Sequence, residues 1–216
     1  MIQPASAQSR CSRKRSLTLV SSGSGTPSAS GQTSVTVEGT TRTIGVDLLV
    51  PDSLGGPGRR GARIPPHGRH TARKVVGLEG SLVDRDRHVL SALESADRRE
   101  VELMVAGPAA LIVAKVHKIG ERVGKSNRAS DKDALDVYRL LRAIPTQELA
   151  RRFAVLQQAA VARDVTGTAL AQMPQLFGTP RAPGCVMAVR AAAPLEPAET
   201  LAASLVALAE DLRRSL

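Results

Sequence analysis

The order of two hydrophobic patterns along the chain limits the fold most. Segments with the β-branched, alternating character of strands lie in the first half, at 34–38, 43–50 and 100–105. After Gly107 the apolar residues recur with helical spacing, and Pro108 stands where a helical first turn tolerates proline. Strands followed by helices are typical of an α+β architecture. We therefore expect a small mixed β-sheet followed by a helical C-terminal half.

The strand and helix boundaries follow from turn and capping residues. The strands at 34–38 and 43–50 are expected to form a hairpin through a turn at 39–42, and Ser130 is expected to be the N-cap of the second helix. The expected helices are 108–123, 131–143, 146–165, a shorter one that ends near 176, and 197–216, with a Pro- and Gly-rich loop at 177–194.

The core has to be built mainly from aliphatic side chains. Aromatic residues number only three, at Tyr138, Phe153 and Phe177, while 42% of the chain is hydrophobic. The last helix carries an apolar stripe of Leu201, Leu205, Leu208 and Leu212. Ala, Leu and Val should fill most of the interior, and stacking platforms for single-stranded nucleic acid are not expected.

Charge and composition divide the chain into three expected regions. Residues 1–32 have the composition of a disordered, basic, Ser- and Gly-rich tail. Residues 1–74 hold 11 Lys and Arg but only 3 Asp and Glu, and many of the cations fall in a long Gly- and Pro-rich loop at 51–74. Such a segment attracts polyanions. Residues 33–123 then form an α+β region and residues 124–216 a helical region.

Cysteine usage and hydropathy favour a cytoplasmic protein. Cys11 and Cys185 form neither a metal-binding pattern nor a disulfide framework. No run of about 18 apolar residues is present, so we expect no membrane partner. The apolar stretch at 17–20 is too short for a secretory signal.

Two expected helices place charged residues among apolar neighbours. In the first, Lys115 lies on the flank of the stripe formed by Ile112, Val116 and Ile119, while His117 lies on the opposite face. In the second, Asp133 shares its side with Val137, so it should be more buried than Asp136. Buried charge is costly without a partner or a role, and this placement therefore predicts a site.

The same segment resembles the distal half of AbiEii-type nucleotidyltransferases, bacterial abortive-infection proteins of the DNA polymerase beta-like superfamily. The resemblance covers roughly residues 34–144. It depends on the strand at 100–105, the run 108–115, Glu121-Arg122, and a final group of Lys132, Asp133, Asp136 and Tyr138.

The resemblance implies roles for four residues. Lys115 would bind the phosphates of a nucleoside triphosphate, while Asp133, with Asp136 beside it, would have a catalytic role by orienting a reacting group. Asp47, between Val46 and Leu48, would help to hold Mg²⁺. The implied reaction is attack of an acceptor hydroxyl, for example of an RNA, on the α-phosphate. A cognate antitoxin protein would be a further partner.

The chain departs from the family upstream of Asp47. The Gly-Gly or Gly-Ser turn and the Asp-x-Asp strand that should come first are missing, and the pair Asp84 and Asp86 is followed by no third carboxylate of the right kind. We therefore expect a truncated or decayed member with impaired or absent activity.

Other interpretations of these residues stay open. Lys115 is also compatible with a surface lysine whose ammonium reaches water, and Asp133 with a carboxylate that complements the helix N-terminus. The basic loop is compatible with a non-enzymatic nucleic-acid-binding module. The helical half is compatible with a partner-binding module.

Overall fold

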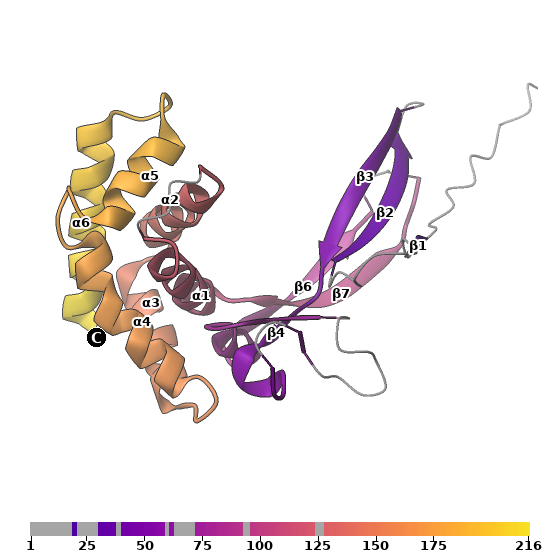
Figure 1. The fold of residues 1–216 in the computed structure, drawn as a ribbon, viewed down its shortest axis with the longest axis horizontal. Coiled ribbons are helices and arrows are strands. Elements are labelled where there is room, and N and C mark those ends of the chain that lie inside the picture. The colour runs from indigo at the N-terminus through magenta and orange to yellow at the C-terminus, as the bar shows by residue number, and fades with distance from the viewer. Residues whose placement is uncertain are drawn as a thin grey trace, which may run out of the picture.

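The structure, a computed structural model, describes residues 19–20, 30–37, 40–58, 61–62, 72–92, 96–123 and 128–216. Most of the expected tail, and residues 59–60 and 63–71 of the expected basic loop, lie outside these ranges. The helices gather on one side of the molecule and most of the strands extend away on the other (Figure 1). The α+β architecture with a helical C-terminal half is confirmed.

The described strands form three small sheets. Their bounds are β1 (Leu19–Val20), β2 (Ser30–Val37), β3 (Thr40–Asp47), β4 (Leu49–Pro51), β5 (Arg73–Val75), β6 (Arg85–Ser91) and β7 (Glu100–Ala106). β1, β2 and β3 pair antiparallel, β4 and β5 pair parallel, and β6 and β7 pair antiparallel. Two short 3₁₀ helices, η1 (Asp52–Leu54) and η2 (Glu79–Leu82), follow β4 and β5.

The predicted hairpin is present, but its second strand begins earlier than predicted. Val37 pairs with Thr40, so residues 40–42 belong to β3 and not to a turn. The β-branched residues Thr40 and Thr41 favour the extended conformation. The segment 51–74 was predicted to be a loop, but its described ends contain regular structure, namely η1 and the start of β5.

The β6–β7 ribbon leaves apolar side chains exposed on both of its faces. Directly paired residues share a face, so Leu90 lies with Val101 on one face and Arg87 with Met104 on the other. Leu90, Val101 and Met104 are all exposed. On the second face, Arg87 Nη1 also forms an ion pair of 3.4 Å with Glu102 Oε2. The ribbon therefore contributes little to the core.

Six helices form the other part of the described chain. They are α1 (Pro108–Gly120), α2 (Arg128–Ala143), α3 (Thr146–Gln158), α4 (Arg163–Phe177), α5 (Pro183–Ala192) and α6 (Ala198–Ser215). Their apolar faces meet in one core, which includes the large buried side chains Ile112, Ile119, Leu149, Phe153, Leu156, Phe177, Leu201, Leu205 and Leu212. The expected aliphatic core and the stripe of the last helix are confirmed, with Leu208 only partly buried.

Three helix predictions were wrong in detail. α2 begins at Arg128, so Ser130 lies inside the helix and is not its N-cap. The helix predicted to run from 146 to 165 ends at Gln158, because Ala159 is extended, and a new helix starts at Arg163. In both cases the flanking residues are good helix formers, so propensity alone could not place the boundary.

The third error concerns the predicted loop at 177–194, which contains α5. Pro183 occupies the first turn of this helix after an extended Ala182. Proline suits that position because its missing N–H has no intrahelical partner there. The residues that follow are mostly Ala, Val and Met, and Ala188 and Met187 are buried. The proline therefore marks the start of a helix.

The ribbon joins the helices at Asp84 and Gly107. The Gly107 N–H donates to the Asp84 carbonyl at 2.8 Å, and Asp84 Oδ2 accepts the N–H of Ala110 in the first turn of α1 at 2.9 Å. A Cβ on Gly107 would overlap the Asp84 carboxylate. Arg152 of α3 binds the other oxygen, Asp84 Oδ1, at 2.7 Å. One buried carboxylate thus connects the ribbon, α1 and α3.

Candidate functional site

The structure brings together three of the four predicted site residues. Lys115 Nζ lies 2.8 Å from Asp136 Oδ2 and 3.3 Å from Asp133 Oδ1. Lys115 comes from α1, and the two aspartates lie one helical turn apart on α2. The prediction that these residues share a site is consistent with this geometry.

The burial of these side chains follows from the packing of the two helices. α1 turns Ile112, Val116 and Ile119 into the core, and the flanking Lys115 side chain is left 22% exposed. Asp133 lies beside the buried Val137 and is 8% exposed, whereas Asp136 is 33% exposed. The expected order of burial is therefore confirmed. The Lys115 ammonium binds carboxylates rather than only water.

Three further cations complete the group. Lys118 Nζ lies 3.1 Å from Asp133 Oδ2, and Arg122 Nη1 lies 3.3 Å from the same oxygen. Arg139 Nη1 lies 3.3 Å from Asp136 Oδ1. The α1–α2 charge cluster, as we call it, consists of Lys115, Lys118, Arg122, Asp133, Asp136 and Arg139.

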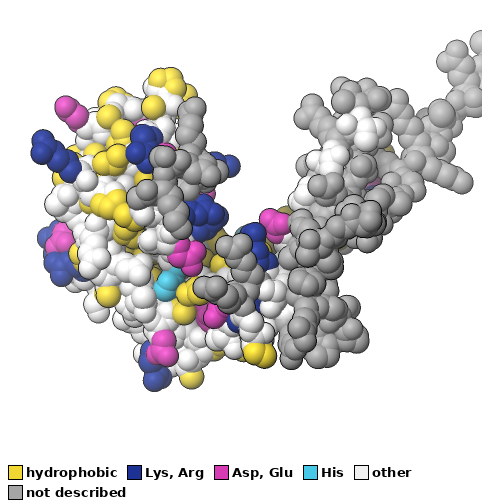
Figure 2. Space-filling model, in the orientation of Figure 1, with side chains coloured by type: hydrophobic (Ala, Val, Ile, Leu, Met, Phe, Trp, Pro, Cys, Tyr) yellow, Lys and Arg dark blue, Asp and Glu magenta, His cyan; other side chains and the backbone are white. Residues whose placement is uncertain are grey.

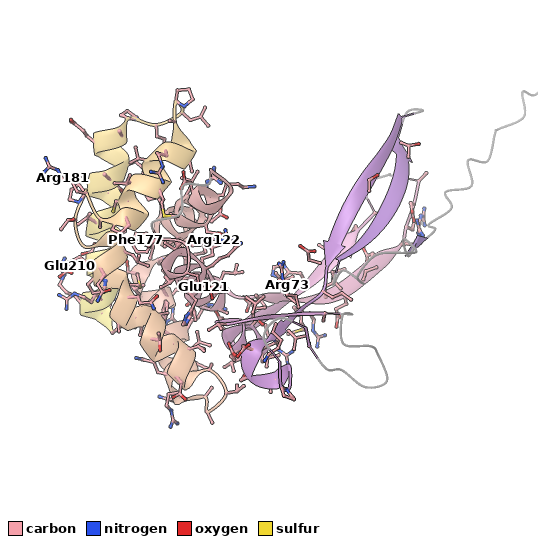
Figure 3. The ribbon with its side chains drawn as sticks, in the orientation of Figure 1. Arg73, Glu121, Arg122, Phe177, Arg181 and Glu210 are labelled. Carbon is pink, nitrogen blue, oxygen red and sulfur yellow. The ribbon has the colours of Figure 1, made fainter. Side chains whose placement is uncertain are left out.

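Sequence reasoning assigned no role to Lys118, Arg122 or Arg139, although a signal was present. Lys115, Lys118 and Arg122 are spaced i, i+3 and i+7, which places them along one face of a helix. Arg122 lies in the turn that follows α1, where its backbone N–H donates to the Ile119 carbonyl at 2.9 Å, and Figure 3 labels its side chain. What the sequence could not show is that this face lies against α2.

The cluster carries more positive than negative charge. Four cations surround two carboxylates, so the six side chains have a surplus of two positive charges. A buried carboxylate requires such partners because its own desolvation is costly. Acidic and basic side chains lie next to one another on the surface over α1 and α2 (Figure 2). The group is therefore anchored in the protein at Asp133 and open to solvent at its cations.

Asp47 is not part of this cluster. It is exposed at the end of β3, where its backbone pairs with Ser30. No hydrogen bond or ion pair found in the described part of the chain joins it to Lys115, Asp133 or Asp136. A single exposed carboxylate is not a sufficient ligand set for Mg²⁺. Among the described residues no group of three or more His, Cys, Asp or Glu is arranged to hold a metal ion.

The pair Asp84 and Asp86 binds a cation of the protein itself. Arg152 Nη1 contacts Asp84 at 2.7 Å and Asp86 at 2.9 Å, and Arg152 Nε contacts Glu148 at 2.7 Å. The hydrogen bonds to Asp84, and then to Glu148 and Asp86, raise the pKa of the Arg152 guanidinium. This group therefore fixes the base of the ribbon.

His117 faces away from the cluster, as expected, but it is buried. Its Nε2 lies 2.8 Å from the carbonyl oxygen of Val165 in α4. Gly77, with φ of 87°, packs against the ring, and a Cβ there would approach His117 Cδ2 to 2.7 Å. The opposite face of α1 is thus covered by protein.

Asp131, which sequence reasoning left without a role, is also buried and paired. Arg190 of α5 donates to it twice, Nε to Oδ2 and Nη2 to Oδ1, each at 3.0 Å. The hydrogen bonds to Asp131 raise the pKa of Arg190. Since α5 itself was predicted to be a loop, the sequence offered no indication of this pair.

No family model, curated protein or solved structure matches this chain. Within the part of the chain that the structure describes, none of the helices is both long enough and apolar enough to span a bilayer.

Proposed function

We propose that the α1–α2 charge cluster binds the phosphates of a nucleoside triphosphate, in a nucleotidyltransferase-like protein with impaired or absent transfer activity. The observation that carries this proposal is the surplus of positive charge around Lys115, the residue to which the family resemblance assigns phosphate contact. Phosphate oxygens accept charge-assisted hydrogen bonds from ammonium and guanidinium groups.

The charged ends of the cations converge on one point, which suits an anion that accepts several hydrogen bonds. Lys115, Lys118 and Arg122 all lie within 3.3 Å of the Asp133 carboxylate, although Lys115 and Arg122 are seven residues apart in the chain. One phosphate group could therefore contact more than one of these side chains, and a polyphosphate could engage them together.

The aspartates act on the cations in this proposal. Both oxygens of Asp133 are engaged, Oδ1 by Lys115 and Oδ2 by Lys118 and Arg122. Asp133 and Asp136 therefore orient the side chains that hold the phosphates, whereas the resemblance implies that they orient a reacting group. Preorganised cations stabilise the charge that develops during phosphoryl transfer without having to rearrange.

Transfer itself would require an acceptor hydroxyl and Mg²⁺, which in this family neutralises phosphate charge when bound. The described residues do not supply a complete ligand set for this ion. We therefore propose binding as the retained property, with a cytoplasmic location and an RNA or antitoxin partner as expectations from the resemblance.

Calorimetric titration with ATP, CTP, GTP and UTP tests the proposal. Wild type should release or absorb heat with at least one nucleotide. Lys115→Ala should weaken the affinity for that nucleotide by at least about tenfold, since a hydrogen bond between charged groups contributes about 1.5–3 kcal/mol. Arg213→Ala removes an exposed cation outside the cluster, which pairs with Glu210 on α6, and serves as the control. Binding that Lys115→Ala leaves unchanged would contradict the proposal, as would no binding by wild type.

A further inference from the structure

The Asp131–Arg190 pair links the helix that carries the aspartates of the cluster to α5. Asp131 lies in the first turn of α2, where its side chain is 5% exposed, and Arg190 lies in the last turn of α5, where its side chain is 54% exposed. Two parallel hydrogen bonds of 3.0 Å join them. This two-pronged geometry fixes the orientation of the Arg190 guanidinium relative to the Asp131 carboxylate as well as the distance between them.

The pair also satisfies a buried charge. A carboxylate as enclosed as that of Asp131 is costly unless a cation and hydrogen bonds compensate it. The positions of both residues add to the attraction, because acids are favoured at a helix N-terminus and bases at a C-terminus. The start of α2 is therefore held against α5 at one defined point.

The contact between Asp131 and Arg190 lies close in the sequence to the α1–α2 charge cluster. Asp131 and Asp133 are two residues apart in α2, and Asp133 binds Lys115 and Lys118 of α1 and Arg122 of the turn that follows α1. A rotation or fraying of the first turn of α2 would therefore move the Asp133 carboxylate away from all three cations. Arg190 touches none of these three cations itself.

We infer that Arg190 is a positioning residue for the α1–α2 charge cluster, which acts through Asp131 to set where Asp133 holds its cations. The binding measurement below rests on the proposed function, but a second measurement does not. Lysine should replace Arg190 only partly, because an ammonium keeps the charge and lacks the planar fork.

A double-mutant cycle on nucleotide affinity tests the inference. Arg190→Gln should weaken affinity by about tenfold, the effect of losing a charged hydrogen bond. Asp131→Asn combined with Arg190→Gln should be no weaker than the worse single variant, because both act through one contact. Arg190→Lys should recover part of the loss. Arg213→Gln removes an equally exposed arginine, paired with Glu210 on α6, and should bind like wild type.

Nuclear magnetic resonance of the Lys115 ammonium, labelled with ¹⁵N, tests the same inference without a nucleotide. In wild type and in Arg213→Gln, the carboxylates of Asp133 and Asp136 should protect this ammonium from exchange with water. Arg190→Gln should remove that protection. Leu212→Ala, which makes a cavity in the core under α6, should lower thermal stability and leave the ammonium signal in place.

These results separate the inference from the proposed function. If wild type binds no nucleotide but Arg190→Gln abolishes the Lys115 signal, the function is wrong and the positioning role stands. An unchanged Lys115 signal in Arg190→Gln overturns the inference, and so does loss of the signal in Leu212→Ala to the same extent. The inference is also overturned if the fold-losses in affinity of Asp131→Asn and Arg190→Gln multiply in the double variant, because the two residues would then act independently.

Discussion

The Lys115 ammonium and the Asp136 carboxylate lie 2.8 Å apart although the two residues are separated by 21 positions in the chain. Because Lys115 also contacts Asp133, one cation from α1 joins two carboxylates on successive turns of α2. The two aspartates differ in burial and in the number of their partners. That difference allows their contributions to be distinguished by mutation.

Asp133→Asn should destabilise the protein far more than Asp136→Asn. Removal of the buried Asp133 charge deprives Lys115, Lys118 and Arg122 of a shared partner, and we expect a loss of about 3 kcal/mol in the free energy of unfolding. Asp136 is more exposed, so its loss should cost about 1 kcal/mol or less. Urea unfolding of both variants measures the difference. Equal losses would show that Asp133 is not the anchor of the cluster.

Gly107→Ala and Gly167→Ala should shift stability in opposite directions. At Gly107 a Cβ would overlap the buried Asp84 carboxylate, which also accepts the Ala110 N–H, and we expect a loss of about 2 kcal/mol or more. At Gly167, within α4, a Cβ meets no atom within 4 Å. There alanine should stabilise the helix by about 0.5–1 kcal/mol. Thermal unfolding compares the two, and a tolerated Gly107→Ala would disprove the close contact.

Arg152→Gln should destabilise the protein, whereas the neighbouring Arg151→Gln should not. Arg152 binds the buried Asp84 and also Asp86, so its loss leaves a carboxylate at the base of the ribbon without its cation, at an expected cost of about 3 kcal/mol. Arg151 is exposed, and its ion pair with Glu148 and its hydrogen bond to the Gln147 carbonyl both lie on the surface of α3, so we expect a change within about 0.5 kcal/mol.

Chemical denaturation of both variants gives these values. Hydrogen exchange of the Ala110 amide, which donates to Asp84, should also accelerate in Arg152→Gln alone. An Ala110 amide that stays protected in this variant would mean that Arg152 does not hold the junction.

The Cys185 thiol should make stability depend on alkaline pH. Burial raises the pKa of Cys185 to about 11 from an ordinary value of 9.0. In the unfolded chain the thiol therefore loses its proton first, and the folded state loses stability as the pH rises from about 9 towards 11. Urea unfolding at pH 8 and pH 10.5 measures this effect. Cys185→Ala should show a smaller decrease between the two pH values, and an identical decrease would rule out a contribution from the thiol.

Periodicity predicted the burial of the cluster correctly, for an identifiable reason. Lys115 and Asp133 are each placed beside buried apolar residues of their own helices, Ile119 and Val137, so local spacing was sufficient. The same argument failed to find Arg190, because its partner Asp131 lies 59 positions away. Pairing between distant elements is not encoded in the spacing of one helix.

The largest difference between the predicted and the observed fold lies at a proline. Pro145 and Pro183 both precede or open helices in the structure, whereas the sequence pattern predicts a helix only after Pro145. Pro183 is followed by Gly184, and two such residues together favour a turn in a local reading. Packing decides otherwise, since Gly184 is buried against Phe177 and Cys185 is buried as well.

The close approach of Asp84 and Gly107 has a consequence for how this chain could change its length. Their backbones are joined by a hydrogen bond of 2.8 Å, so the ribbon leaves the helical part and returns to it at one place. Insertions or deletions at the far end of the ribbon, between Ser91 and Glu100, would alter its reach without shifting the register of α1. The ribbon is therefore a natural position for grafting a foreign peptide, with the helical core as its carrier.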